Sequence, residues 1–322
     1  MYAAVVDAFG QPPHYREFET PQPVGEHEAL VEVVASGLHP RVRSQATGTH
    51  YTSTEELPLI PGIDGVGRLA SGGLVYFVLP DTTMGAMAQH TVIDLRRCIH
   101  LPDETDPLLV AAAMNPGMSS WVALRKRVRI TPGQSVLILG ATGSAGQLAI
   151  QVARHLGAGH IIGAGRDATR LGLLPGLGAH DVVSLTGAAA DVAEALGKAA
   201  SHVDVVLDYL WGTPAEEAML ALARGRADPG QPLHWVQIGA VAGPTAQIPS
   251  AALRSTNLCL MGSGQGSVPT RDILSELPAL ATEIAHGTFE LHVEAEPLSL
   301  VESVWTKPVR ADGRIVLTPS MT

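Results

Sequence analysis

The chain has 322 residues, of which 46% are hydrophobic and 16% charged, so it can bury a sizeable core, and global disorder is excluded. A formal net charge of −10 argues against broad binding to nucleic acids or anionic membranes. Two cysteines, Cys98 and Cys259, cannot form a disulfide framework or a four-thiolate zinc lobe. No membrane-length apolar run and no signal-peptide pattern is visible, so we expect a soluble cytoplasmic protein.

The first 115 or so residues predict a β-rich, irregular domain. Apolar runs at residues 29–34 and 73–79 are separated by turns rich in proline, glycine and aspartate. Because Val31 and Val33 alternate with Glu32, the first run predicts a strand with one buried face.

Strands and helices alternate after Pro116. Runs of valine, isoleucine and leucine predict strands covered on both faces, and hence a mostly parallel sheet. The predicted strands are 135–139, 160–164, 181–184, 203–207 and 233–238, and the predicted helices are 118–128, 148–154, 188–200 and 215–223. Glycine and proline in 171–176 predict that any helix there is short. One more helix and the strands 289–293 and 313–317 are expected to return to the first domain.

A glycine-rich segment, residues 139–146, follows the first of these strands and opens a helix, as a dinucleotide-binding fingerprint requires. Gly140 can make the tight turn, Gly143 lets the backbone approach a pyrophosphate, and Gly146 permits close helix packing. The N–H groups at the helix start would face the anion. The spacing is G-x-x-G-x-x-G rather than G-x-G-x-x-G, so an ordinary glycine turn is the alternative. The candidate cofactor-binding residues here are Gly140, Thr142, Gly143, Ser144, Ala145 and Gly146.

The residues that select the cofactor are expected about 20 positions further on, where an acidic side chain would bind the ribose 2′-hydroxyl of NADH. This chain instead has Gly165, followed by Arg166 and, one turn later, Arg170. Arginine suits a 2′-phosphate, and such a charge-assisted contact contributes about 1.5–3 kcal/mol. We therefore predict NADPH. In one alternative Asp167 binds the ribose of NAD, and in another both arginines are solvated charges.

Further segments extend a resemblance over essentially the whole chain. They are residues 35–40, 59–67, 111–116, 133–143, 203–208 and 313–319, with the sequences ASGLHP, LIPGIDGVG, AAAMNP, GQSVLILGATG, VDVVLD and GRIVLTP. Together these segments resemble the zinc-independent medium-chain dehydrogenase/reductases, specifically the NADPH:quinone oxidoreductases.

The resemblance implies an α/β protein with a doubly wound parallel Rossmann sheet and a β-rich, GroES-like catalytic domain. The first part of the catalytic domain would cover residues 1–117, the Rossmann NADPH-binding domain 118–262, and the return to the catalytic domain 263–322. The resemblance also implies a homodimer, and hydride transfer in a zinc-free cleft between the two domains.

Zinc can be tested against the sequence. Zinc-bearing relatives have a cysteine where this chain has His39, and a G-H-E triplet where residues 62–64 read GID. No H-E-x-x-H or comparable ligand spacing occurs among the 13 histidines. We therefore expect no metal site. The alternative is a site formed by His39, His50 and His90.

Without a metal, a hydrogen-bond donor must stabilise the charge that develops on the acceptor oxygen. In the resemblance, a tyrosine in a G-x-Y-type loop lies beside the nicotinamide, and the corresponding loop here ends in Tyr51. Tyr51 is thus the candidate catalytic donor, with a packed loop tyrosine as the alternative. His39, where relatives often carry asparagine, is the second catalytic candidate. The segment 67–73 is shorter than in relatives, which leaves acceptor specificity open.

The remaining candidates follow other strands, because ligands of such sheets bind beyond the carboxyl ends of the strands. They are Asp208, Gly239, Ala240, Ser263 and Gly264. We expect an NADPH-dependent oxidoreductase that transfers hydride to a small-molecule quinone, with no nucleic-acid or membrane partner. An enoyl or 2-alkenal reductase acting on enones is the alternative enzyme. A non-catalytic NADPH-binding protein is the alternative from another class.

Overall fold

The computed structural model describes residues 1–308, 310 and 313–319. The chain divides into two compact units: unit 1 comprises Met1–Asn115 and Leu277–Thr322, and unit 2 comprises Pro116–Glu276. The boundaries lie inside helices α2 (Pro107–Val122) and α9 (Thr270–Ala285). The sequence predicts breaks after residues 117 and 262, so the second boundary lies further along the chain than expected. No described helix is long and apolar enough to cross a membrane.

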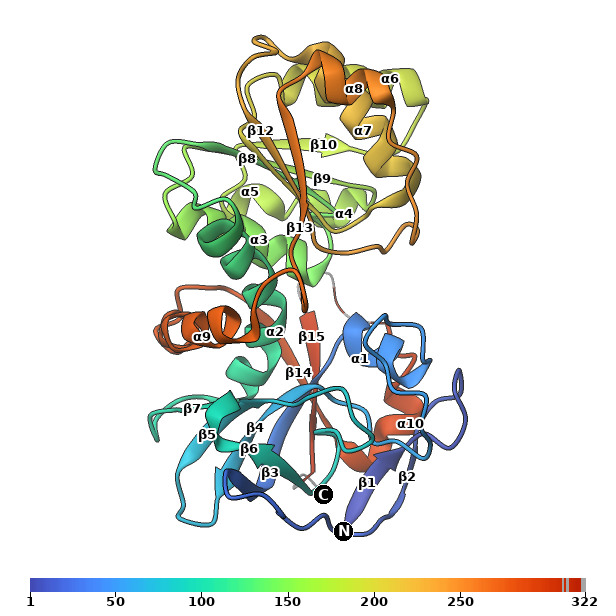
Figure 1. The fold of residues 1–322 in the computed structure, drawn as a ribbon, viewed down its shortest axis with the longest axis vertical. Coiled ribbons are helices and arrows are strands. Elements are labelled where there is room, and N and C mark those ends of the chain that lie inside the picture. Colours follow the sequence, from blue (N-terminus) through green and yellow to red (C-terminus); the bar gives the residue numbers. More distant parts are fainter. Residues whose placement is uncertain (309, 311–312, 320–322) are drawn as a thin grey trace. The chain divides into compact units, whose positions relative to one another are not determined.

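Unit 2 is built on a six-stranded parallel sheet with the strand order β10-β9-β8-β11-β12-β13 (Figure 1). The chain starts at the centre, runs to one edge, and then returns to fill the other half. This is the 3-2-1-4-5-6 order of a doubly wound sheet, so the predicted Rossmann fold is confirmed. The strands are β8 (Ser135–Leu139), β9 (His160–Gly165), β10 (Asp181–Ser184), β11 (Val205–Asp208), β12 (Leu233–Gln237) and β13 (Leu258–Gly262).

Helices alternate with these strands. They are α3 (Ser144–His155), α4 (Ala168–Leu171), α5 (Leu174–Leu177), α6 (Ala189–Ala199), α7 (Gly212–Gly225) and α8 (Ser250–Ser255). Helices α4 and α5 have only four residues each, as the glycines and proline around them predict. Strand β8 is central, and Val136, Leu137, Ile138 and Leu139 are all fully buried, which explains its unbroken apolar sequence.

Unit 1 contains a seven-stranded mixed sheet and a two-stranded ribbon. In the sheet, the order is β14-β15-β3-β4-β5-β7, with β6 paired to β3; only β14 and β15 run parallel to each other. In β3, Val31 and Val33 are buried and Glu32 is exposed, as their alternation predicts. The strands are β1 (Tyr2–Val5), β2 (His14–Glu17), β3 (Glu28–Leu38), β4 (Asp64–Leu69), β5 (Leu74–Val78), β6 (His90–Asp94), β7 (Cys98–His100), β14 (His292–Pro297) and β15 (Gly313–Thr318), and the short helices are α1 (Pro40–Ala46) and α10 (Val301–Val304).

Two predicted elements differ in extent. The helix expected at 118–128 begins at Pro107, includes Pro116, and continues as a π-helical turn, Ala123–Arg127. Pro116 removes only one helical hydrogen bond, and the packing of the buried residues before it outweighs that loss. The strand expected at 289–293 lies instead at His292–Pro297, because its register is set by parallel pairing with β15.

Candidate functional site

The glycine-rich turn in unit 2 has a geometry that requires glycine at positions 140 and 146. Gly140 adopts a φ of +87°, and its N–H and that of Ala141 both donate to the Ala164 carbonyl oxygen at 2.9 Å. A Cβ on Gly146 would lie 2.4 Å from the Gly140 carbonyl oxygen, so only glycine lets α3 pack this closely. A Cβ on Gly143 would have a single neighbour within 4 Å, at 3.5 Å, so a side chain there would project away from the loop.

Helix α3 begins directly after this turn and leaves its N-terminus open. Its N-cap residue is Gly143, which has no side chain to cap the first turn. Ser144 and Ala145 form that turn and are both half-buried. The N–H groups of a helix start and the positive end of the helix dipole suit an anionic group, so the loop can accept a phosphate.

At the end of β9, Gly165 is buried and Arg166 is exposed. Asp167 caps helix α4: its Oδ1 accepts the Arg170 N–H at 3.0 Å, and its Oδ2 lies 3.5 Å from Arg170 Nε. Arg170 Nη1 also donates to the Thr142 carbonyl oxygen at 3.4 Å. The structure thus brings the glycine-rich turn and the predicted selectivity residues together. In it, Asp167 caps helix α4.

Asp208, at the end of β11, is fully buried and engaged within unit 2. Its Oδ1 accepts the N–H groups of Leu210 and Trp211 at 2.8 and 3.0 Å, and its Oδ2 accepts the Trp235 indole N–H at 3.0 Å. Burial raises the pKa of Asp208, and the three hydrogen bonds oppose that rise. Trp211 has a φ of +53°, unusual for a large residue, and its bond to Asp208 stabilises that turn. Asp208 thus positions the turn after β11, and its contact with the cofactor stays a prediction.

Tyr209 is the point at which three loops meet. A Cβ on Gly239 would lie 2.8 Å from the Tyr209 carbonyl oxygen, and a Cβ on Gly140 would lie 3.2 Å from Tyr209 Cβ. The Tyr209 hydroxyl lies 2.9 Å from Ser119 Oγ, and burial raises its pKa to about 12. The loops after β8, β11 and β12 therefore approach one another by backbone contact, which explains two of the predicted glycines.

A pocket opens beyond the carboxyl ends of β12 and β13. Its lining residues are Trp211, Gln237, Pro244, Leu260, Met261 and Gly262. The predicted residues Ser263 and Gly264 follow directly, whereas Ala240 is exposed. Gln237 connects the two strand ends: its carbonyl oxygen accepts the Ser263 N–H at 2.9 Å, and its side chain donates to the Gly239 carbonyl oxygen at 3.0 Å. Gln237, Pro244 and Met261 are not among the residues predicted from the sequence, although Gln237 and Met261 lie at strand ends, which was a usable signal.

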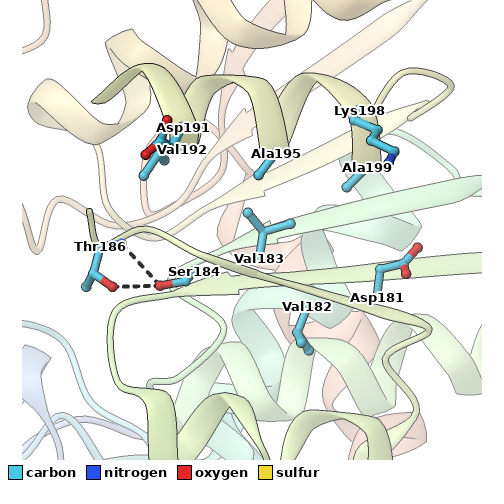
Figure 2. Close-up of a pocket in the computed structure, with 10 residues that line it drawn as sticks. All are labelled: Asp181, Val182, Val183, Ser184, Thr186, Asp191, Val192, Ala195, Lys198 and Ala199. Carbon is cyan, nitrogen blue, oxygen red and sulfur yellow. Dashed lines mark hydrogen bonds between the residues drawn. The ribbon is translucent and has the colours of Figure 1, made fainter. Parts of the chain in front are cut away.

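A second hollow lies between β10 and α6 (Figure 2). Val183, Val192, Ala195 and Ala199 form its apolar floor, and Ser184 and Thr186 are hydrogen-bonded to each other at one end. None of the residues that line it belongs to the predicted nucleotide site, so we assign it no part in the chemistry.

In unit 1, His39 lies in a buried polar cluster. Its Nε2 is 3.2 Å from Asp64 Oδ1, while the Tyr76 hydroxyl donates to Asp64 Oδ2 at 2.9 Å. All three residues are at most 2% exposed. Burial lowers the pKa of His39, although Asp64 pulls it the other way, and burial raises the pKa of Tyr76 well above its usual value. His39 is therefore a neutral, positioned imidazole whose Nδ1 is buried without a hydrogen-bond partner.

Tyr51 lies on an exposed loop of unit 1. Its side chain is 72% exposed and packs on the His50 ring, with centroids 4.3 Å apart. His50 Nδ1 lies 2.9 Å from Thr52 Oγ1, which in turn donates to Asp81 at 2.7 Å. Arg41 bonds to both Thr52 and Asp81. The loop is thus fixed by a polar network, and the tyrosine is presented to solvent rather than packed in a core.

The shortened segment after β4 is a hairpin turn. Gly72 has a φ of +93° and donates its N–H to the Leu69 carbonyl oxygen at 2.8 Å, while the Leu69 N–H bonds to Gly73. The segment therefore joins β4 to β5 directly and forms no extended loop.

Comparisons with known proteins agree with this architecture. A family model described as zinc-binding dehydrogenase matches residues 145–282. A probable NADPH-dependent quinone reductase of Emericella nidulans is 30% identical over 360 aligned positions, which cover 99% of this chain and 100% of the relative. The chain belongs to the quinone oxidoreductase-like medium-chain dehydrogenase/reductases.

Two further similarities are informative for this oxidoreductase. The structure of a quinone oxidoreductase from Thermus thermophilus, described together with its NADPH complex, has a TM-score of 0.75 and 26% identity, covering 99% of this chain and 100% of that one. A 2-methylene-furan-3-one reductase of Solanum lycopersicum is 25% identical over 179 residues, which cover 51% of this chain and 46% of that protein.

The residues at the positions of the zinc ligands do not fit a metal. His39 and Asp64 face each other, and Tyr76 occupies the second carboxylate oxygen. Among the residues that the structure describes, no group of three or more histidine, cysteine, aspartate or glutamate side chains could hold a metal ion.

The environment of His50 predicts a pH-dependent stability. Burial, aided by Arg41 and opposed by Asp81, lowers the pKa of His50 to about 4 from 6.5. Between pH 6.5 and about 4 the unfolded chain binds more protons at this residue, so the free energy of unfolding should fall as the pH falls. In His50→Gln this decline should be shallower, as measured by urea unfolding across that range. The exposed His286→Gln is the matched control, and equal slopes in wild type and His50→Gln would contradict the prediction.

Proposed function

We propose that this oxidoreductase uses NADPH to reduce quinones without a metal. The observation that carries the proposal is the arrangement around the glycine-rich turn. There, the open N-terminus of α3 lies beside a strand end that has Gly165 instead of a carboxylate, followed by Arg166 and Arg170. The absence of an acidic side chain at position 165 and the exposed arginine that follows it favour a 2′-phosphorylated nucleotide.

The residues of unit 2 fit such a nucleotide. Gly140, with a φ of +87°, and Gly146, which has no room for a Cβ, keep the turn tight. Ser144 and Ala145, in the first turn of α3, would bind the pyrophosphate, and Arg166 the 2′-phosphate. Gly239, Ala240, Ser263 and Gly264 follow the strands that form the pocket with Gln237, where they would border the nicotinamide half. When bound, NADPH supplies the hydride.

The residues of unit 1 would act on the acceptor. Tyr51 is exposed and stands on a loop fixed by a polar network, so we assign its hydroxyl as the donor to the oxygen that gains charge during reduction. His39 is neutral and oriented by Asp64, so it would act as a polar contact and not as a metal ligand. These roles require no acid stronger than a phenol, which suits a quinone because it accepts hydride readily.

Reduction of an activated double bond is the second candidate function. The similarity to the 2-methylene-furan-3-one reductase favours it, and the same hydride geometry would serve an enone. An enone also needs a proton on its α-carbon, so the two functions place different demands on the donor. The homodimer and the cytoplasmic location stay predictions from the resemblance and the sequence.

Arg166→Ala tests the choice of cofactor. If Arg166 binds the 2′-phosphate, the variant should bind NADPH about 10- to 100-fold more weakly and NADH almost unchanged. The dissociation constants can be measured by nucleotide fluorescence titration. Arg224→Ala removes an exposed arginine from α7 and controls for the change in net charge. Equal losses for both nucleotides, or a wild-type preference for NADH, would count against the proposal.

Metal analysis tests the zinc-free site. Because no group of three or more potential ligand side chains occurs among the described residues, purified protein should contain no stoichiometric zinc by elemental analysis. Its NADPH oxidation with a benzoquinone should persist after dialysis against EDTA. Stoichiometric zinc that is lost together with the activity would overturn this part of the proposal.

Tyr51→Phe tests the donor. Removing the hydroxyl should lower kcat more than it raises KM, because the bond matters mainly in the transition state. Since Tyr51 is 72% exposed, water can partly replace it. We therefore expect a loss of about tenfold, below the 10²–10³ typical of an enclosed donor. The loss should be larger for an enone than for a naphthoquinone. Tyr2→Phe is the control, and unchanged kinetics with both acceptors would remove Tyr51 from the mechanism.

A further inference from the structure

The end of β9 and the glycine-rich turn are locked together at Gly165. Backbone hydrogen bonds hold this strand on both sides: Gly140 and Ala141 donate to the Ala164 carbonyl oxygen at 2.9 Å, and Leu185 donates to the Gly165 carbonyl oxygen at 2.8 Å. Strand β9 is also paired in parallel with β8 and β10. The Cα of Gly165 therefore cannot move without breaking the sheet.

The side chain of Thr142 fills the space in front of Gly165. A Cβ added at position 165 would lie 2.5 Å from Thr142 Cγ2, 2.8 Å from Thr142 Oγ1 and 3.1 Å from Thr142 Cβ. Real Cβ atoms essentially never show contacts below 3.0 Å, so even alanine at 165 would collide with both γ atoms.

Thr142 has no simple way to withdraw. Its carbonyl oxygen accepts hydrogen bonds from Arg170 Nη1 at 3.4 Å and Gln147 Nε2 at 3.5 Å, which tie the loop backbone to α4 and α3. Rotation about χ1 does not clear the space either. There are three staggered positions around χ1 of Thr142, and two of them face Gly165. Because a β-branched residue always fills two of the three positions, at least one γ atom faces Gly165 in every rotamer.

We propose that Thr142 is a specificity-determining residue for the nucleotide. Its γ atoms exclude any side chain at position 165, including the carboxylate that would bind the ribose 2′-hydroxyl of NADH. They thereby keep the space beside Arg166 clear for a 2′-phosphate. The inference rests on the proposed NADPH-dependent function. It adds that Thr142 and Gly165 form a steric pair, in which the side chain of one residue excludes a side chain at the other. A substitution of Gly165 alone therefore cannot reverse the preference for NADPH over NADH.

Nucleotide binding tests the pair in the full-length protein. Gly165→Asp should weaken NADPH binding without improving NADH binding, because the new side chain collides with Thr142. Adding Thr142→Ala removes both contacts shorter than 3.0 Å, so the double variant should bind NADH about 10- to 100-fold more tightly than Gly165→Asp. Gly165→Asp with Thr142→Val is the matched control, since valine keeps both γ positions filled and should give no gain.

Thermal unfolding without nucleotide tests the steric contact separately. Gly165→Ala should lower the midpoint of unfolding by roughly 3–10 °C in the wild-type background. The drop should be much smaller in the Thr142→Ala background, because the two residues are in contact. An equal drop in both backgrounds would overturn the inference.

The outcomes separate this inference from the proposed function. Improved NADH binding in Gly165→Asp alone, or in the valine double variant, would overturn the steric pair even if wild type binds NADPH tightly. A wild-type protein that binds neither nucleotide would overturn both the proposed function and the specificity role of Thr142. The unfolding measurements would still decide whether the collision exists.

Discussion

The parallel sheet of unit 2 depends on close backbone contact at the carboxyl ends of its central strands. Gly146 brings α3 against the turn at Gly140, and Gly239 brings the loop after β12 against Tyr209. A Cβ at either Gly146 or Gly239 would lie less than 3 Å from a backbone oxygen. Because side chains are excluded here, the edge presents N–H groups and glycines, which is the surface that a phosphate-bearing ligand needs.

The carboxylate at the end of β11, Asp208, is buried and has a structural role. A carboxylate following β11 suggests a contact with the cofactor, but Asp208 is fully buried and satisfied by two backbone N–H groups and the Trp235 indole. An unpaired buried carboxylate would be costly, so these bonds are needed for the fold itself. Asp208 also holds the turn at Trp211, and Trp211 lines the adjoining pocket.

In unit 1, one of the two candidate catalytic residues is buried and the other is exposed. His39, Asp64 and Tyr76 form a buried, hydrogen-bonded cluster. The Tyr51 loop, in contrast, is held from below by Thr52, Asp81 and Arg41 and leaves its aromatic ring exposed. One polar network is therefore internal, and the other supports a residue that faces outward.

Much of the fold could be derived from the sequence, because local patterns carry it. The apolar runs of β8, β9 and β11 reveal a parallel sheet, and the spacing of Gly140, Gly143 and Gly146 identifies the turn between strand and helix. The extent of α2 through Pro116 could not be derived, since packing of its buried residues outweighs a local helix-breaking signal.

The sequence by itself determined which residue types stand at the nucleotide turn and that an acidic residue is missing at position 165. Only the tertiary structure decided which side chain fills the space in front of position 165 and where Asp208 points. Contacts between Thr142 and Gly165, or between Asp208 and Trp235, join residues more than 20 positions apart in the chain. Such contacts depend on strand order and register, which set distances that no local sequence pattern contains.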